Sequence, residues 1–290
     1  MFQQVNRFVT QFRELEKREY ARSREEERLW QSLKDKLSAS LTEEQPAAVR
    51  RCIAVTGLYA QAGASFLAAN ASFLLAGSGV SVTLCELPGT ASYYYFALDC
   101  ERRAHHRFKN SSASVLLMQS NHLRILVDTP LSNESSTPTD TADWLLRMTK
   151  ESATVVIDLS SRWKEEQAVR VMDLADEIWV VFDSDLARFT RLFLTEETPS
   201  WWEKHGEKIR LIANKWNEYL SRSAIMKKVE GTISLWNSER FAPGIDAVIP
   251  LIDSEKTAAA QAKASLLLEL YTEEEHRFLP LLHSEKGRML

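Results

Sequence analysis

Short apolar runs alternate with longer amphipathic stretches along the chain from residue 51 onward. Seven runs have the length and composition of strands, and they cover residues 52–56, 80–86, 123–127, 154–158, 177–182, 209–213 and 247–249. Helical periodicity fills several of the intervals, at residues 65–76, 141–151 and 164–174, and a closing helix is predicted over 254–276. Strands that alternate with helices form βαβ units. The pattern therefore predicts a three-layer α/β fold, with helices on both faces of a mostly parallel, twisted sheet of about seven strands.

Residues 1–45 follow a different pattern, with no Gly or Pro and a high density of Glu, Arg, Lys, Gln and Leu. Apolar residues recur at helical spacing in two stripes, formed by Phe2, Val5, Val9, Phe12 and Leu15 and by Trp30, Leu33, Leu37 and Leu41. We predict an N-terminal helical extension over 1–45, a folded domain over 50–276 and a C-terminal tail over 277–290. The apolar stripes need a surface to cover them, which the folded domain, a partner, a second copy or a membrane could provide. The candidates for binding a partner are Phe2, Val5, Val9, Phe12, Trp30, Leu33 and Leu37.

Composition narrows the classes of function. No apolar run is long enough to cross a bilayer, and the N-terminus lacks the apolar centre of a signal peptide, so a cytoplasmic protein is expected. The formal net charge of −4 argues against general binding of nucleic acid. The three cysteines, Cys52, Cys85 and Cys100, lack metal-ligand spacing and are expected to be buried, free thiols, so no metal site is predicted.

The segment after the first strand carries the strongest chemical signal. It runs Gly57-Leu58-Tyr59-Ala60-Gln61-Ala62-Gly63-Ala64-Ser65 and leads into a helix. A glycine-containing loop between a strand and a helix is the setting of a phosphate-binding loop, because the helix N-terminus offers free N–H groups to an anion.

Later landmarks in the same order give the chain a resemblance to the ParA/MinD family of P-loop ATPases. Val155-Val156-Ile157-Asp158 resembles the Walker B strand of that family, and Leu211-Ile212-Ala213-Asn214-Lys215 resembles the strand whose end contacts adenine. Val248-Ile249-Pro250 resembles a late element near the base, and Glu86 ends the second strand, where the family has an acidic pair. The resemblance covers roughly residues 50–275 and implies a P-loop NTPase-like fold.

The departures from the family pattern concern charge. Gly63 and Ser65 keep the last glycine and the magnesium-binding hydroxyl, but Ala64 stands where the family has its phosphate-gripping lysine. Tyr59 stands at the position of the second lysine, and Pro88 at that of the second acid. Loss of one electrostatic donor costs catalysis roughly 3 kcal/mol, so we expect a pseudo-ATPase without meaningful turnover. No cofactor is expected, although Ser65, Asp158, Asn214 and Pro250 leave weak binding of ATP and Mg²⁺ open.

The leading hypothesis is a catalytically inactive spatial organiser or assembly scaffold that acts through protein contacts, such as those that localise a pilus, flagellar, secretion, division or partition apparatus. Its partners would bind the N-terminal helix, and a homodimer is compatible with the family. The alternative is an ATPase switch of the same type that retains ATP binding, associated with membrane or DNA. Peripheral attachment to the inner face of the membrane through the first apolar stripe is a third hypothesis, which the acidic residues after Glu14 disfavour.

Two aromatic segments and one basic run remain without a role. Tyr93-Tyr94-Tyr95-Phe96 suits a core or an interface equally, and at least one of Trp201 and Trp202 is expected to be partly exposed, because adjacent residues cannot share a helix face. The basic residues around His105 and His106 favour a solvated surface, with a site for an acidic partner as the alternative.

Overall fold

The computed structural model describes residues 50–88, 92–103, 105–106, 114–128, 141–217, 222–236 and 244–282. The N-terminal extension lies outside them, and so do its candidate partner-binding residues Phe2, Val5, Val9, Phe12, Trp30, Leu33 and Leu37. The chain divides into two units, Met1–Ala48 and Val49–Leu290, and every described residue belongs to the second.

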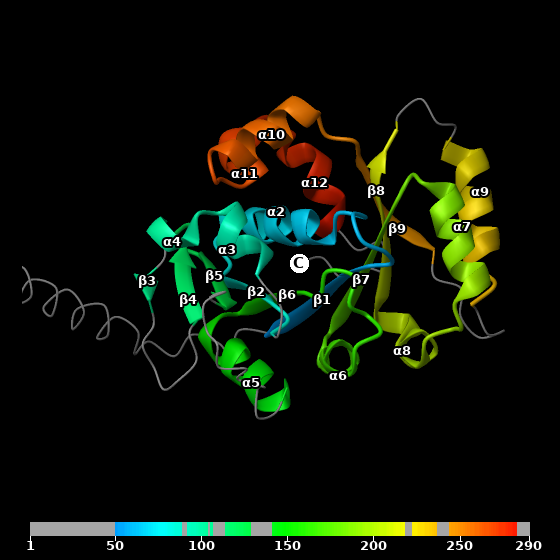
Figure 1. Ribbon diagram of the computed structural model, residues 1–290, viewed down its shortest axis with the longest axis horizontal. Helices are drawn as coiled ribbons and strands as arrows, with labels where there is room; N and C mark the ends of the chain where they lie inside the picture. Colours follow the sequence, from blue (N-terminus) through cyan, green and yellow to red (C-terminus); the bar gives the residue numbers. More distant parts are fainter. Residues whose placement is uncertain are drawn as a thin grey trace, which may run out of the picture. The chain divides into compact units, whose positions relative to one another are not determined.

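One sheet organises the described residues, with the strand order β3-β4-β5-β2-β6-β1-β7-β8-β9 (Figure 1). The strands are β1 (Arg51–Gly57), β2 (Val82–Glu86), β3 (His105–His106), β4 (Ser114–Met118), β5 (Leu123–Asp128), β6 (Thr154–Asp158), β7 (Glu177–Asp183), β8 (Ile209–Trp216) and β9 (Ile245–Pro250). All seven predicted strands are present, and they pair in parallel. The edge strand β3 and its neighbour β4 were not predicted, and they add antiparallel pairs to the sheet.

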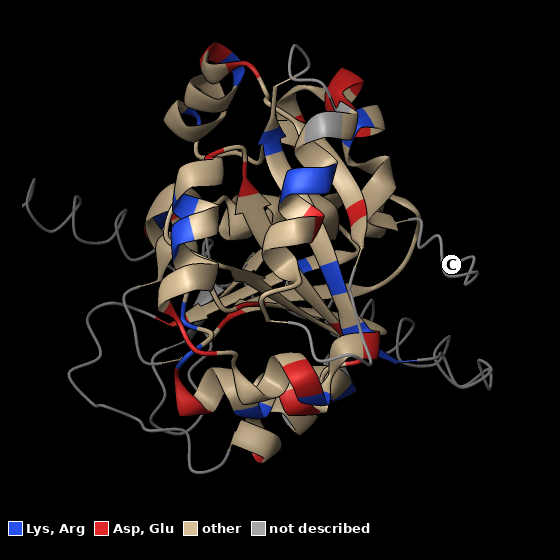
Figure 2. Cartoon of the chain, turned by 90° about the vertical axis from the view of Figure 1, so that its right-hand side faces the viewer, with Lys and Arg blue, Asp and Glu red and all other residues tan. Residues whose placement is uncertain are grey.

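Helices cover both faces of this sheet, as predicted. They are α2 (Ala64–Gly77), α3 (Tyr93–Ala97), α4 (Cys100–Arg103), α5 (Thr141–Glu151), α6 (Glu166–Leu174), α7 (Leu186–Thr195), α8 (Ser200–Lys204), α9 (Arg222–Ile233), α10 (Ser254–Ala262), α11 (Leu267–Leu270) and α12 (Glu275–Leu282). Short 3-10 turns lie at Gly206–Lys208 and Thr272–Glu274. Helices α2, α11 and α12 pack together on one face, and α5 and α6 lie on the other (Figures 1 and 2).

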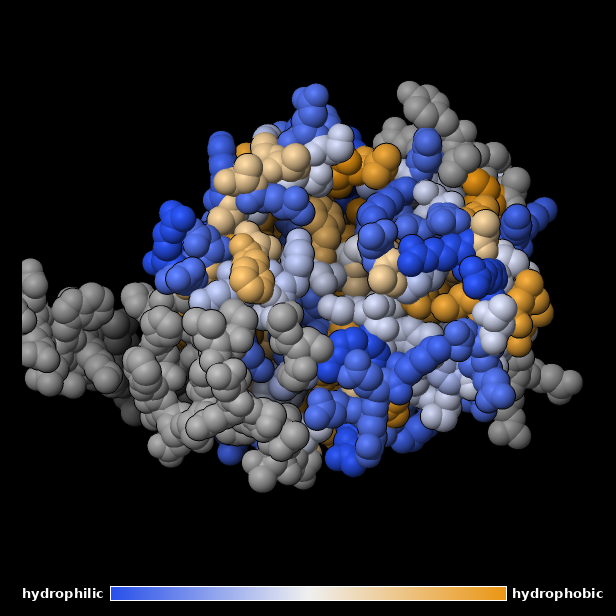
Figure 3. Space-filling model, viewed as in Figure 1, coloured by the Kyte–Doolittle hydropathy of each residue, from blue (hydrophilic) through white to orange (hydrophobic). Residues whose placement is uncertain are grey.

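The core follows the central strands. Ile53, Ala54 and Val55 of β1 are wholly buried, because a parallel strand with helices on both sides has no solvent-facing row. Apolar side chains also reach the surface, notably Leu194 of α7 and Leu235 just after α9. Patches of hydrophobic colour are visible on the face shown in Figure 3. Within the described part of the chain, no helix combines the length and the apolar character that crossing a bilayer requires.

The C-terminal region corrects two boundaries of the sequence analysis. The predicted helix over 254–276 is interrupted after α10, where Ala264 adopts a left-handed conformation with φ 50°. Helix α12 then continues beyond residue 276, and its Phe278 and Leu281 are fully buried. The expected tail at 277 therefore begins with a packed helix, because these apolar side chains complete the core on the face of α2.

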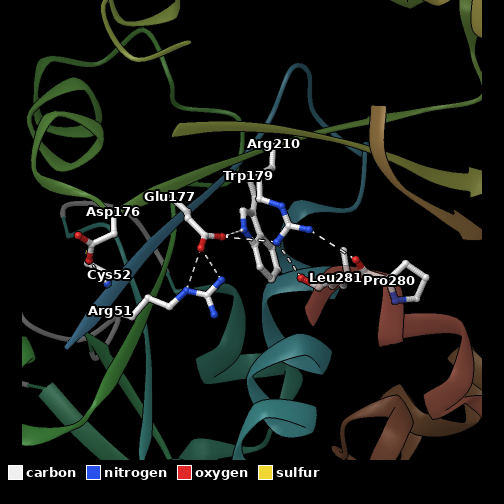
Figure 4. Close-up of polar contacts among 8 residues, drawn as sticks. All are labelled: Arg51, Cys52, Asp176, Glu177, Trp179, Arg210, Pro280 and Leu281. Atoms are coloured by element: carbon white, nitrogen blue, oxygen red, sulfur yellow. Dashed lines mark hydrogen bonds and ion pairs between the residues drawn. The ribbon is translucent and has the colours of Figure 1, made fainter. Parts of the chain in front are cut away.

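A charged cluster fastens α12 to the start of the central strands (Figure 4). Arg210 of β8 donates to the carbonyl oxygen of Leu281 at 2.8 Å and pairs with Glu177 of β7 at 3.5 Å. Glu177 also pairs with Arg51 at 2.5 Å and accepts a hydrogen bond from Trp179 Nε1 at 3.0 Å. Burial alone would raise the pKa of Glu177, but Arg51, Trp179 and Arg210 outweigh it and lower that pKa.

The predicted exposure of the tryptophan pair is wrong. Trp201 and Trp202 are 1% and 2% exposed. They lie on the short helix α8 within a cluster of aromatic rings from other elements, including Trp163, Phe193 and Trp236, which cover both sides of the pair. The cysteines Cys52, Cys85 and Cys100 are free and buried, as expected.

Candidate functional site

The candidate site lies where the parallel strands end. Gly57, Glu86, Asp158 and Pro250 are the last residues of β1, β2, β6 and β9, and Asn214 lies near the end of β8. Glu86 and Asp158 are register partners on neighbouring strands. The structure thus brings these predicted residues to the carboxyl edge of the sheet, the edge at which open α/β sheets bind ligands.

The loop between β1 and α2 is tied to neighbouring strands by its backbone. The Leu58 N–H donates to the Val181 carbonyl oxygen of β7 at 2.9 Å, and the Gly57 N–H donates to the Ser160 carbonyl oxygen just after β6 at 2.6 Å. Gly63 has φ 95°, and a Cβ atom there would lie 2.2 Å from Asn214 Nδ2. This position therefore requires glycine both for its left-handed backbone and for the close approach of β8.

Asn214 and Lys215 both contact the loop. Asn214 is 2% exposed, and its Nδ2 donates to the Ala62 carbonyl oxygen at 2.9 Å. Lys215 Nζ donates to the Gln61 carbonyl oxygen at 2.6 Å, which places an ammonium group beside the loop. Ala64, the first residue of α2, is 5% exposed and contributes a methyl group at the helix N-terminus.

The Tyr59 side chain crosses from the loop to β7. It is 8% exposed, and its hydroxyl donates to Asp183 Oδ1 at 2.8 Å. The Arg188 guanidinium lies over its ring at 4.5 Å from the centroid. Burial is the main cause of a raised pKa for the Tyr59 phenol, so the group stays neutral. At the position of the family's second lysine, the chain thus has an uncharged group that is fixed within the protein.

Asp158 is surrounded by neutral donors. Its Oδ1 accepts from the Ser160 N–H at 2.7 Å, and its Oδ2 lies 3.0 Å from the Tyr94 hydroxyl. Burial raises the pKa of Asp158, and hydrogen bonds from Ser65, Ser160 and Tyr94 offset only part of that rise. Through the Ser160 N–H, Asp158 caps the loop that follows β6.

Glu86 anchors the start of α3. It accepts hydrogen bonds from the Ser92 hydroxyl and, at 2.8 Å, from the Tyr93 N–H. Burial raises the pKa of Glu86 to about 7, although the Ser92 hydrogen bond lowers it and Asp158 raises it further. A cavity of about 20 Å³ adjoins this carboxylate, and its lining comprises Cys85, Glu86, Leu87, Pro88, Ser92, Leu126, Asp128 and Trp144. That volume suits about one water molecule.

Sequence reasoning missed three residues of this site. The first is Tyr94, which belonged to an aromatic run without an assigned role. The second is Trp163, whose Nε1 donates to the Leu58 carbonyl oxygen at 3.0 Å. The third is Asp183, whose carboxylate accepts a hydrogen bond from the Tyr59 hydroxyl. Asp183 alone had a usable signal, because it is a carboxylate at the carboxyl end of a buried strand. In the part of the chain that the structure describes, no cluster of three or more His, Cys, Asp or Glu residues is arranged to hold a metal ion.

The strand order and the parallel pairing around β1 define a doubly wound α/β fold. No protein-family model matches the chain, and no curated protein matches it either. Solved structures specify the fold further. A ParA family ATPase from Chlorobium tepidum superposes with a TM-score of 0.57 and 16% identity, covering 82% of this chain and 99% of that protein.

Two MinD structures give similar results. MinD from Pyrococcus furiosus superposes with a TM-score of 0.58 and 13% identity over 80% of this chain and 96% of its own. A chain of the MinC:MinD cell division complex of Aquifex aeolicus superposes with a TM-score of 0.55 and 14% identity, covering 79% of this chain and 93% of its own. The chain therefore has the ParA/MinD type of P-loop ATPase fold, as the sequence resemblance implied.

Proposed function

We propose that the chain is a catalytically inactive ParA/MinD-like protein that acts as a spatial organiser or assembly scaffold through protein contacts. The observation that carries the proposal is Ala64, a buried methyl group at the helix N-terminus where the family's lysine would grip phosphate. Phosphoryl transfer relies on fixed positive charge at the terminal phosphate. A methyl group supplies none.

The neighbouring side chains support the same conclusion. Tyr59 is hydrogen-bonded to Asp183, so the other lysine position also holds a neutral, buried group. Lys215 lies beside the loop between β1 and α2, but its ammonium group is hydrogen-bonded to the Gln61 carbonyl oxygen of that loop. The site residues thus do not fit a magnesium triphosphate well, since their polar groups bind one another.

Without ATP hydrolysis, we expect the chain to act by binding other proteins. One of the similar structures is a complex of MinD with MinC, so this fold can present a surface to a protein partner. In this chain we propose that the two N-terminal apolar stripes provide the docking element. This assignment rests on their helical spacing in the sequence.

Measurement of phosphate release from ATP tests the catalytic part of the proposal. The full chain is incubated with ATP and Mg²⁺ beside an Asp158→Ala variant. We expect both proteins to release phosphate at the rate of a blank without protein. Turnover by the natural chain that the substitution abolishes would overturn the proposal.

The alternative function, an ATP-binding switch that borrows its cation, draws support from Lys215. Its Nζ lies 2.6 Å from the Gln61 carbonyl oxygen, so a change in its rotamer would bring positive charge toward a phosphate on the loop. Calorimetry distinguishes the two functions. Submicromolar binding of MgATP that Lys215→Ala weakens at least tenfold would favour the ATP-binding switch. No detectable binding of MgATP would rule the switch out.

A further inference from the structure

A single buried hydroxyl connects three elements of the candidate site. Tyr94, on α3, is 1% exposed. Its hydroxyl oxygen lies 2.8 Å from the carbonyl oxygen of Ser65 on α2 and 3.0 Å from Oδ2 of Asp158 on β6. The phenol therefore occupies the space between the first turn of the phosphate-loop helix and the acidic strand end.

The proton count at this junction favours a neutral Asp158. One phenolic proton cannot fully satisfy two acceptors, the Ser65 carbonyl and the Asp158 carboxylate. A protonated Asp158 resolves the conflict, because it donates to the phenol oxygen while the phenol donates to Ser65. Burial raises the pKa of Asp158, which is the direction that this arrangement requires.

Helix α3 is also held at its start. The Glu86 carboxylate accepts from the Tyr93 N–H at 2.8 Å and from the Ser92 hydroxyl, and the Ser92 oxygen accepts from the Tyr95 N–H at 3.0 Å. The backbone that carries Tyr94 is thus fixed to β2, while its hydroxyl reaches α2 and β6. This five-residue helix consequently joins three elements of the sheet edge.

We propose that Tyr94 is an internal replacement for a bound ligand, and that its hydroxyl holds α2, α3 and β6 in one conformation without nucleotide or metal. The inference rests on the proposed function and deepens it. A chain whose site is closed by its own side chain presents its surfaces constantly and does not depend on a nucleotide cycle.

The test compares Tyr94→Phe with Tyr95→Phe in the full chain. Tyr95 is the adjacent residue of the same helix and is 7% exposed, and its hydroxyl has no hydrogen bond within the described residues, so it is a matched control. Loss of the Tyr94 hydroxyl removes a hydrogen-bond partner from the Ser65 carbonyl oxygen and from the buried Asp158 carboxyl group. We expect the Tm of Tyr94→Phe to fall by roughly 3–8 °C, whereas the Tm of Tyr95→Phe should shift by less than about 2 °C.

Hydrogen exchange locates the effect. Amides of residues 64–68 and 158–160 should exchange about tenfold faster in Tyr94→Phe and at the natural rate in Tyr95→Phe. Identical melting and exchange in the two variants would overturn the role of Tyr94. Binding of MgATP by the natural chain would instead overturn the proposed function and leave the effect of the hydroxyl measurable, so the two failures are distinguishable.

Discussion

Substitution of Gly63 by alanine tests whether the loop is fastened to β8 as the structure indicates. With φ 95°, the position holds a conformation that costs an L-residue roughly 1–2 kcal/mol. The added Cβ would also lie 2.2 Å from Asn214 Nδ2, so the amide has to move. That movement sacrifices its 2.9 Å hydrogen bond to Ala62 O, at a cost of about 1–3 kcal/mol. The expected total loss of unfolding free energy is about 2–5 kcal/mol.

The chain offers a matched control at Gly79. Its φ of 87° is similar, but an added Cβ would meet nothing within 4 Å. Gly79→Ala therefore isolates the conformational cost, roughly 1–2 kcal/mol. Urea unfolding of both variants measures the difference, which we expect to exceed about 1 kcal/mol. Equal losses would refute the contact between the loop and Asn214, as would full additivity of Gly63→Ala with Asn214→Ala.

Three further predictions concern buried polar groups. Tyr59→Phe removes the hydrogen bond to Asp183 and should lower the unfolding free energy by about 1–2 kcal/mol in urea titrations, while an unchanged midpoint would contradict that bond. Because burial raises the pKa of Glu86 to about 7, the folded protein binds that proton more tightly than the unfolded chain, so this group makes stability fall as pH rises toward 7. Glu86→Gln should therefore gain stability relative to the natural chain between pH 5 and pH 8, and a constant difference would contradict the assignment. Glu177 has a lowered pKa, so its stabilising effect is present at neutral pH and is lost as pH falls below about 4. Arg210→Ala should accordingly cost about 1–3 kcal/mol at pH 7 and speed amide exchange in α12, and unchanged exchange there would refute the role of the Arg210–Leu281 hydrogen bond.

The sheet was predictable because each central strand is a separate, largely apolar run. β6 and β7 are apolar along nearly their whole length, because both faces of each strand are buried. Short, continuous apolar runs of this kind are typical of the strands of a parallel sheet. The strand β4 was missed because it pairs antiparallel with β5 across a short turn, so no helix separates the two strands and the βαβ alternation does not mark it. The break after α10 was missed because Ala264, not glycine, adopts the left-handed conformation, so no turn signal marks it.

Positions in the site were predictable, but the partners of their side chains were not. Gly63, Ala64 and Asp158 could be placed because strand ends and the loop occur in a fixed order along the chain. The contacts of Tyr59 and Tyr94 depend on residues 124 and 64 positions away. No local spacing encodes such contacts, since they follow from the packing of the folded sheet.

Calorimetric titration of the full chain with ATP and Mg²⁺ tests most directly whether the loop has lost its ligand. We expect no saturable heat, because the polar groups of the site are already hydrogen-bonded to Tyr59, Tyr94 and the loop itself. Saturable binding at submicromolar affinity, about −8 kcal/mol or stronger, that disappears in Asp158→Ala would contradict this expectation.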